Sequence, residues 1–136
     1  MATLDTTILV DLLRPRSKSH RSALAKLADL ASRGDSLLTT RFNVAELEVG
    51  TELSDDPPRD RHDVDVLLAE IGILEFDALA ARTVAKITAE KRRKGSSIGD
   101  MDALIAATSL AAGHALLVTR NLSHFANIPG LEVEDY

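Results

Sequence analysis

The chain has 136 residues, a length typical of one domain, and its 45% hydrophobic and 27% charged residues exclude a disordered or fibrous protein. It contains no cysteine, which excludes disulfides, thiolate zinc sites and a cysteine nucleophile. The net charge of −5 and the aromatic content of 3% argue against a passive nucleic-acid binder that uses bulk charge or base stacking. No apolar run approaches the roughly 20 residues that span a bilayer, so we expect a cytoplasmic protein without membrane contact.

The first half of the chain alternates short apolar segments with residues at helical spacing. Leu27 and Leu30 share one helical face, and Gly34 follows as a stop signal. Pro57 and Pro58 close a segment that is typical of a turn. We expect strands over residues 2–4 and 36–40, a short helix between Asp5 and Pro15, and helices over residues 19–33, 42–53 and 59–70.

The second half continues the alternation. Residues 72–76 predict a strand and residues 77–93 a helix, whereas residues 100–113 are so rich in Ala, Leu and Ile that we expect a buried helix. Residues 115–118 predict an interior strand and residues 131–133 an edge strand. This order predicts one α/β domain over residues 1–136, with a central, mostly parallel sheet of four to five strands between two helical layers. In such folds ligands bind at the carboxyl ends of the strands.

Asp5 lies directly after the first predicted strand. A carboxylate between Leu4 and the apolar run that starts at Ile8 is costly unless it has a partner or a metal ion. An aspartate at this position is also a common N-cap for the helix that follows. The sequence leaves both interpretations open.

Glu46 lies one turn into the helix that follows the second predicted strand, so it too faces the carboxyl edge of the sheet. Its neighbours Val44, Ala45 and Leu47 are apolar, whereas Glu48 can point to solvent. Glu46 is therefore either an ordinary glutamate on the helix surface or a member of a site at this edge.

Asp100 and Asp102 begin the apolar helix. The segment from Ser97 to Asp100 matches the pattern of a capping box, which gives Asp100 a structural explanation. Asp102 lies beyond the cap, and the helix dipole alone does not justify burying its charge. We expect Asp102 to be the stronger metal ligand and Asp100 an auxiliary one.

Thr119 and Asn121 follow the strand at residues 115–118. Asn121 offers a neutral carbonyl oxygen or serves as a turn residue, and Thr119 can orient a ligand or a water. Carboxylates gathered at one edge repel each other and require a cation. Oxygen ligands without cysteine suit Mg²⁺ or Mn²⁺ better than zinc. The four histidines lack metal-ligand spacing, and we expect them at the surface or at strand ends.

Four segments, in this order and spacing, resemble the PIN-domain ribonucleases, and in particular the VapC toxins of bacterial toxin–antitoxin pairs. The similarity extends over the whole chain to the closing segment from Ile128 to Val133. No single motif is decisive, and the specificity lies in their combination at strand ends. The segments are Leu4-Asp5-Thr6-Thr7, Asn43-Val44-Ala45-Glu46-Leu47, Asp102-Ala103-Leu104-Ile105-Ala106-Ala107 and Leu117-Val118-Thr119-Arg120-Asn121-Leu122-Ser123-His124-Phe125.

The resemblance implies a PIN-like α/β/α fold with Asp5, Glu46 and Asp102 as its three acids. The fourth position of the family, often aspartate, is Asn121 here, which leaves less charge for a second ion, and Asp100 is the residue that could compensate. The resemblance also implies Mg²⁺-dependent endonucleolytic cleavage of structured RNA (tRNA or rRNA), a homodimer, and inhibition by a cognate VapB-type antitoxin.

The mechanism we expect is attack by water activated on Mg²⁺, without a Ser, Cys or His nucleophile. Asp5 and Asp102 would ligate the metal directly, and Glu46 would ligate it or hold the attacking water. Asn121 and Asp100 would hold coordinated waters or a second ion, and Thr6 and Thr119 would support the site.

Basic residues near the acids are candidates for contact with RNA phosphates. One interpretation of the run from Lys91 to Lys94 is a phosphate-contacting rim, and the other is a solvated helix end that complements the helix dipole. A second group, made of Arg14, Arg16, Lys18 and Arg21, follows the first helix. The candidates for RNA contact are Arg41, Lys91, Arg92, Arg93, Lys94 and Arg120.

Two other functions fit an acidic pocket. In an acidic-pocket phosphatase or phosphoacceptor domain Asp5 would be the nucleophile, but position 7 is threonine where such phosphatases need a second aspartate. In a non-catalytic module of the same fold the acids would receive a basic partner peptide. Metal titration followed by an RNA cleavage assay separates these possibilities.

Overall fold

Five short strands form one parallel sheet at the centre of the structure, a computed structural model that describes residues 1–136. The sheet order is β3-β2-β1-β4-β5, and every neighbouring pair is parallel. In the register, Thr3 lies opposite Leu38 on one side and Leu117 on the other. The strands are β1 (Ala2–Leu4), β2 (Leu37–Thr40), β3 (Gly72–Leu74), β4 (Leu116–Val118) and β5 (Glu132–Glu134).

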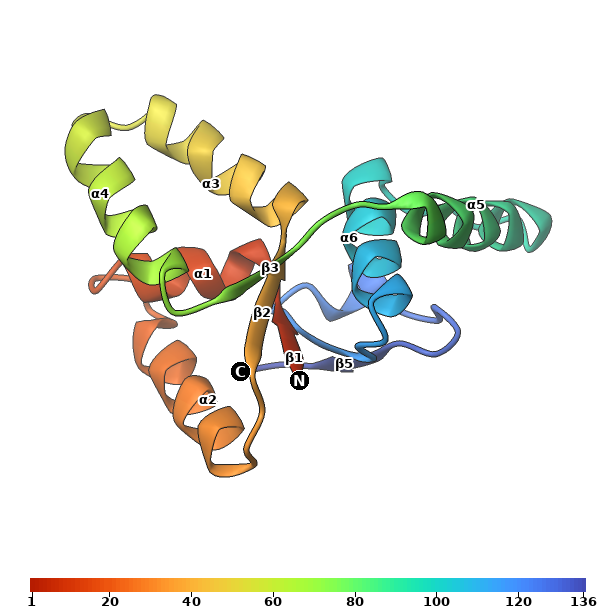
Figure 1. The fold of residues 1–136 in the computed structure, drawn as a ribbon, viewed down its shortest axis with the longest axis horizontal. Helices are drawn as coiled ribbons and strands as arrows, with labels where there is room; N and C mark the ends of the chain where they lie inside the picture. The colour runs from red at the N-terminus through yellow and green to blue at the C-terminus, as the bar shows by residue number, and fades with distance from the viewer.

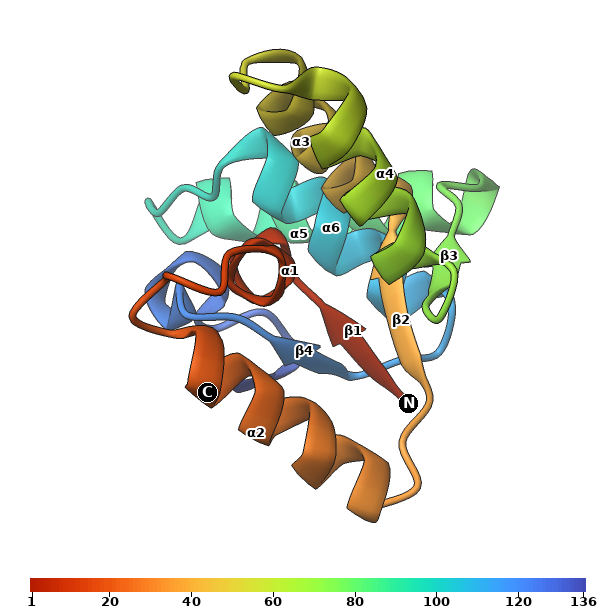
Figure 2. The ribbon, with the colours of Figure 1, turned by 90° about the vertical axis from the view of Figure 1, so that its left-hand side faces the viewer.

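Helices cover both faces of this sheet (Figures 1 and 2). One face carries α1 (Thr6–Leu13) and α2 (His20–Ser32), and the other carries α5 (Ala78–Arg93) and α6 (Asp100–Ala111). Beyond the carboxyl end of β2, α3 (Arg41–Glu52) packs on α4 (Pro57–Leu68), and the short 3₁₀ helix η1 (Leu122–Phe125) follows β4. No helix combines the length and the apolar character that crossing a bilayer requires.

Two apolar clusters, one on each side of the sheet, form the core. Leu4 of β1 and Ile8 of α1 belong to the first, and Ile105 of α6 belongs to the second. The adjacent β4 residues Leu117 and Val118 lie in different clusters, because successive side chains of a strand point to opposite faces. Both faces are therefore buried, which explains the continuous apolar character of the interior strands.

The position of β1 determines where polar side chains meet. β1 is the central strand, with β2 on one side and β4 on the other, so the strand order reverses at this point. Residues that follow β1, β2 and β4 leave the sheet at the same edge, where open α/β sheets bind ligands. Asp5, Arg41 and Thr119 are the first residues after these strands.

The predicted three-layer fold is confirmed, and the sheet is wholly parallel. The start of α4 and the cap of α6 differ from expectation. Helix α4 begins at Pro57 rather than after the two prolines, because Asp56 is its N-cap and proline is tolerated in the first turn. The capping box at Ser97 is wrong: the first intrahelical bond of α6 runs from Ala103 N to Gly99 O (2.9 Å), which leaves Ser97 outside the helix.

Candidate active site

Asp5 lies at the carboxyl end of β1 with a carboxylate held from both sides. The side chain is buried (5% exposed). Its Oδ1 accepts a hydrogen bond from Asn43 Nδ2 (3.0 Å), and its Oδ2 accepts one from Thr119 Oγ1 (2.7 Å). Although Asp5 occupies the N-cap position of α1, its side chain makes no capping hydrogen bond. Neutral donors therefore fix the carboxylate in a direction that the cap interpretation does not explain.

Asn43 connects the start of α3 to this carboxylate. Its buried side-chain oxygen accepts hydrogen bonds from Thr40 N (3.2 Å) and Thr40 Oγ1 (2.7 Å). Its backbone N donates to Thr40 Oγ1 (3.3 Å), which completes a capping box. Its amide nitrogen donates to Asp5 and to Thr6 Oγ1 (2.9 Å). Sequence reasoning missed this role, although the Thr-x-x-Asn spacing at a helix start is a detectable signal.

Glu46 lies one turn further along α3. Thr6 Oγ1 donates to its Oε1 (2.9 Å), so Asp5, Asn43, Thr6 and Glu46 form one hydrogen-bonded chain. Burial raises the pKa of Glu46, the Thr6 hydrogen bond lowers it, and the charges of Asp5 and Asp102 raise it further. Glu46 is therefore a half-buried member of the acidic site and not a solvated surface glutamate.

Asp102 projects from the first turn of α6 toward the same space. Burial raises its pKa, the His124 ring lowers it, and the charge of Asp5 raises it again. His124 Nδ1 lies 3.2 Å from Asp102 Oδ2, a contact that sequence reasoning missed because the two residues lie on separate elements. A Cβ atom at position 99 would lie 3.2 Å from the same Oδ2, so glycine leaves room for this carboxylate.

Three carboxylates from three separate elements thus influence one another at the edge of the sheet, and no Lys or Arg forms an ion pair with them. The all-oxygen donor set fits a hard divalent cation. No three acidic or histidine side chains are close enough to hold an ion together.

The remaining predicted ligands lie at the periphery. Asp100 is exposed at the first position of α6, and Asn121 is exposed at the N-cap of η1. Neither makes a hydrogen bond or ion pair with Asp5, Glu46 or Asp102. Thr6 and Thr119, predicted as supporting residues, both donate hydrogen bonds to the site carboxylates.

Most of the basic residues predicted to contact RNA have partners within the chain. Arg41 Nε donates to Glu75 Oε1 (3.0 Å), and Lys91 Nζ donates to the Ala126 carbonyl (2.7 Å). Lys94 and Arg93 form ion pairs with Glu90 at 3.1 and 3.8 Å. Arg92 alone among the six has no such partner, so the helix-end interpretation explains most of this run and the rim stays a prediction.

Arg120, the sixth candidate, belongs to a second polar cluster on α1. Its Nε lies 3.0 Å from Oδ2 of Asp11, a buried carboxylate (2% exposed), and donates to Tyr136 Oη (3.1 Å). Tyr136 Oη donates to the same Oδ2 (2.6 Å), and Ser17 Oγ donates to Oδ1 (2.7 Å). Burial, followed by the hydrogen bond to Asp11, raises the pKa of Tyr136 to about 12.

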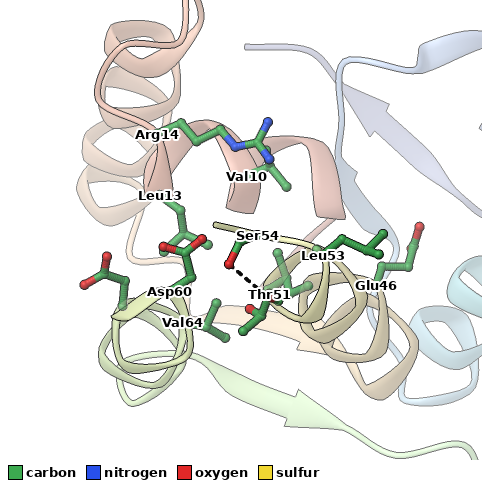
Figure 3. A pocket seen from close by; sticks show the side chains of 12 residues that line it. Val10, Leu13, Arg14, Glu46, Thr51, Leu53, Ser54, Asp60 and Val64 are labelled. Carbon is green, nitrogen blue, oxygen red and sulfur yellow. Dashed lines mark hydrogen bonds between the residues drawn. The ribbon is translucent and has the colours of Figure 1, made fainter. Parts of the chain in front are cut away.

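A groove of about 430 Å³ between α1, α3 and α4 leads away from Glu46 (Figure 3). Its apolar lining includes Val10, Leu13 and Val64, and Arg14 extends along its α1 side. Asp60 of α4 also lines it. The groove therefore joins the acidic site to the loop between α1 and α2.

The chain matches a known family over nearly its whole length. The model of the PIN domain matches residues 2–131. The chain belongs to the PIN domain family. The predicted family is confirmed.

Individual relatives are VapC ribonucleases. The chain is 36% identical over 95 residues to a protein named tRNA(fMet)-specific endonuclease VapC from Salmonella typhimurium, covering 70% of this chain and 71% of the relative. It is 29% identical over 133 residues to Ribonuclease VapC2 from Rickettsia felis, covering 98% and 96%. The structure of VapBC2 from Rickettsia felis, bound to a DNA fragment from their promoter, matches with a TM-score of 0.87 and 27% identity over 99% of this chain and 98% of the other.

Proposed function

We propose that this PIN-domain protein is a metal-dependent endoribonuclease and the toxin of a toxin–antitoxin pair. The carrying observation is the placement of Asp5, Glu46 and Asp102 at one sheet edge, with only neutral hydrogen-bond donors holding Asp5. Burial without an ion pair from Lys or Arg is costly for such a group. A divalent cation from solution would relieve that cost.

The chain's own residues prepare the site. Asn43 and Thr119 orient the Asp5 carboxylate, which with Asp102 would hold Mg²⁺, or Mn²⁺ in its place. A bound ion there would favour deprotonation of water and neutralise charge on the phosphate. Thr6 occupies Glu46 Oε1, which leaves Oε2 to bind the ion or to take a proton from the attacking water.

Asp100 and Asn121 are proposed in outer roles. Both are exposed beside the cluster, Asp100 at the start of α6 and Asn121 just after Thr119. From these positions they would hold waters of the ion or a second ion, a weaker arrangement with asparagine than with a carboxylate at position 121.

The relatives support the substrate and the partner. Names such as tRNA(fMet)-specific endonuclease favour a structured RNA, tRNA or rRNA, as the substrate, and the complex with VapB favours a cognate VapB-type antitoxin as the inhibitor. We also propose that the toxin forms a homodimer.

The test replaces Asp5 with asparagine and compares the variant with Asp65→Asn, an exposed aspartate on α4. The Asp5→Asn variant should lose RNA cleavage by about 10⁴-fold, the scale on which one member of a catalytic unit acts. Activity of the unchanged protein should vanish in EDTA and return with Mg²⁺ or Mn²⁺. Full activity of Asp5→Asn, with the control unchanged, would refute the proposed function.

A further inference from the structure

Three arginines without an ion pair or side-chain hydrogen bond share one open hollow. Arg14 and Arg16 lie in the loop between α1 and α2, and Arg59 lies in the first turn of α4. Pro15 and Ser17 complete the lining. All three arginines are exposed, in contrast to Arg33, Arg41, Arg61, Arg93 and Arg120, which lie within ion-pair distance of carboxylates.

None of these three guanidinium groups forms an ion pair with a carboxylate of the chain. The three positive charges repel each other, so an anion bound in the hollow would be favourable. The hollow differs in this respect from the protein as a whole, which carries a net charge of −5. Arginine presents several donors in a planar fork that matches phosphate oxygens. The chemistry of the hollow therefore suits a ligand with repeated phosphate groups.

The hollow adjoins the groove that leads away from the acidic site, because the two share Arg14. Arg14 lines both the hollow and the groove between α1, α3 and α4, and Glu46 lines the same groove (Figure 3). Asp60 and Asp63 also line this groove, so their charges repel a phosphate from the groove itself. An anionic group beyond the cleavage site would therefore be held at the arginines.

We propose that the hollow formed by Arg14, Arg16 and Arg59 binds backbone phosphates of the RNA strand to one side of the cleaved bond. This inference rests on the proposed ribonuclease function and identifies a binding surface separate from the run Lys91–Lys94. Arg14 connects the two sites, because it lines both the hollow and the groove that leads to Glu46.

The test changes all three arginines to glutamine. In the cleavage-deficient Asp5→Asn background, binding of a fluorescently labelled tRNA(fMet) transcript is measured by anisotropy at increasing KCl concentrations. Each phosphate contact contributes about 0.7 to 0.9 to the slope of log Kd against log salt, so the triple variant should lose about 2 to 3 from this slope. In the otherwise unchanged protein, KM for the RNA should rise while kcat changes little.

Two controls locate the effect. Arg82→Gln removes an exposed arginine without an ion pair on α5 and should leave the salt slope unchanged. Arg92→Gln tests the predicted rim in the same assay and should have a smaller effect than the triple variant. Circular dichroism checks that every variant is folded.

Two results would overturn the inference. One is a triple variant with the same salt slope and KM as its parent. The other is unchanged RNA binding with weakened binding of the VapB-type antitoxin, which would assign the arginines to acidic side chains of that partner. Failure of the ribonuclease function itself is separate, because it would appear as full cleavage by the Asp5→Asn protein.

Discussion

Two buried aspartates at opposite ends of α1 differ in how their charges are compensated. Asp11 is 2% exposed and receives Arg120, Tyr136 and Ser17. Asp5 is 5% exposed and receives only the neutral donors Asn43 and Thr119, with two further acids nearby. The charge of Asp11 is compensated by Arg120, whereas no basic side chain of the protein compensates the charge of Asp5. The comparison separates a structural buried charge from one suited to bind a metal ion.

The largest expected contrast comes from Asp102→Asn. This variant should lose RNA cleavage by about 10³- to 10⁴-fold, because Asp102 belongs to the proposed ion site. In EDTA its thermal unfolding temperature should be equal to or above that of the parent, because burial raises the pKa of Asp102 and its charge costs stability. Cleavage assays and thermal melts measure the two effects. A large loss of stability would place Asp102 in the same class as Asp11.

Removing the Arg120 side chain beside Asp11 should lower stability, in contrast to Asp102→Asn. Arg120→Leu leaves the buried Asp11 carboxylate with only neutral donors, and because Arg120 is partly exposed we expect a cost of about 1 to 3 kcal/mol. Urea unfolding in EDTA measures this loss, and Arg82→Leu serves as the exposed-arginine control. If Arg120→Leu unfolds at the same urea concentration as the control, the Asp11 charge does not depend on Arg120, and the contrast with Asp5 disappears.

Asn43→Ala tests the neutral donors that orient Asp5. Loss of such a supporting hydrogen bond typically reduces metal affinity or activity by 10- to 100-fold. We expect the Mn²⁺ concentration for half-maximal cleavage to rise by about this factor, while cleavage at saturating Mn²⁺ largely recovers. A fall in stability without any change in the Mn²⁺ requirement would show that Asn43 acts only as a helix cap.

The smallest expected effect is the pH dependence of stability in EDTA. The pKa values of Glu46 and Asp102 are raised in the folded protein, chiefly by burial. Their contribution to stability is therefore complete below their ordinary pKa values and is lost as pH rises through the raised folded values. The unfolding temperature should rise as pH falls from neutral toward these ordinary pKa values, and saturating Mn²⁺ should flatten this trend. If acidification lowers the unfolding temperature of both the parent protein and the Glu46→Gln variant, this prediction is wrong.

Periodicity was sufficient to predict the fold, and the resemblance to the PIN-domain ribonucleases singled out the three acids. Alternating strands and helices place Asp5, Glu46 and Asp102 at one edge of a parallel sheet without knowledge of any side-chain contact. The partners of these acids could not be predicted in this way. Asn43 and His124 reach their carboxylates across long separations in the chain, and only packing of separate elements brings them together.

The basic residues show the same limit. The run from Lys91 to Lys94 indicates positive charge at the end of α5, but it gives no sign that Lys91 donates to the Ala126 carbonyl. Arg120 follows a strand end beside the acids, yet its guanidinium binds Asp11 on α1. Basic residues in a sequence indicate where a phosphate could bind, whereas the hydrogen bonds and ion pairs of the folded chain decide which basic side chains are available for that phosphate.

The backbone of Asp5 has a further consequence for how the toxin can be controlled. Its amide donates to the Val118 carbonyl (3.0 Å), so the hydrogen-bonded ladder of the central strand continues into the residue that carries the carboxylate. Amide protons in such a position exchange with solvent only when the whole protein opens. The backbone that carries the Asp5 carboxylate therefore keeps its place for as long as the central strand stays paired, and an inhibitor that covers this carboxylate meets it in a fixed position.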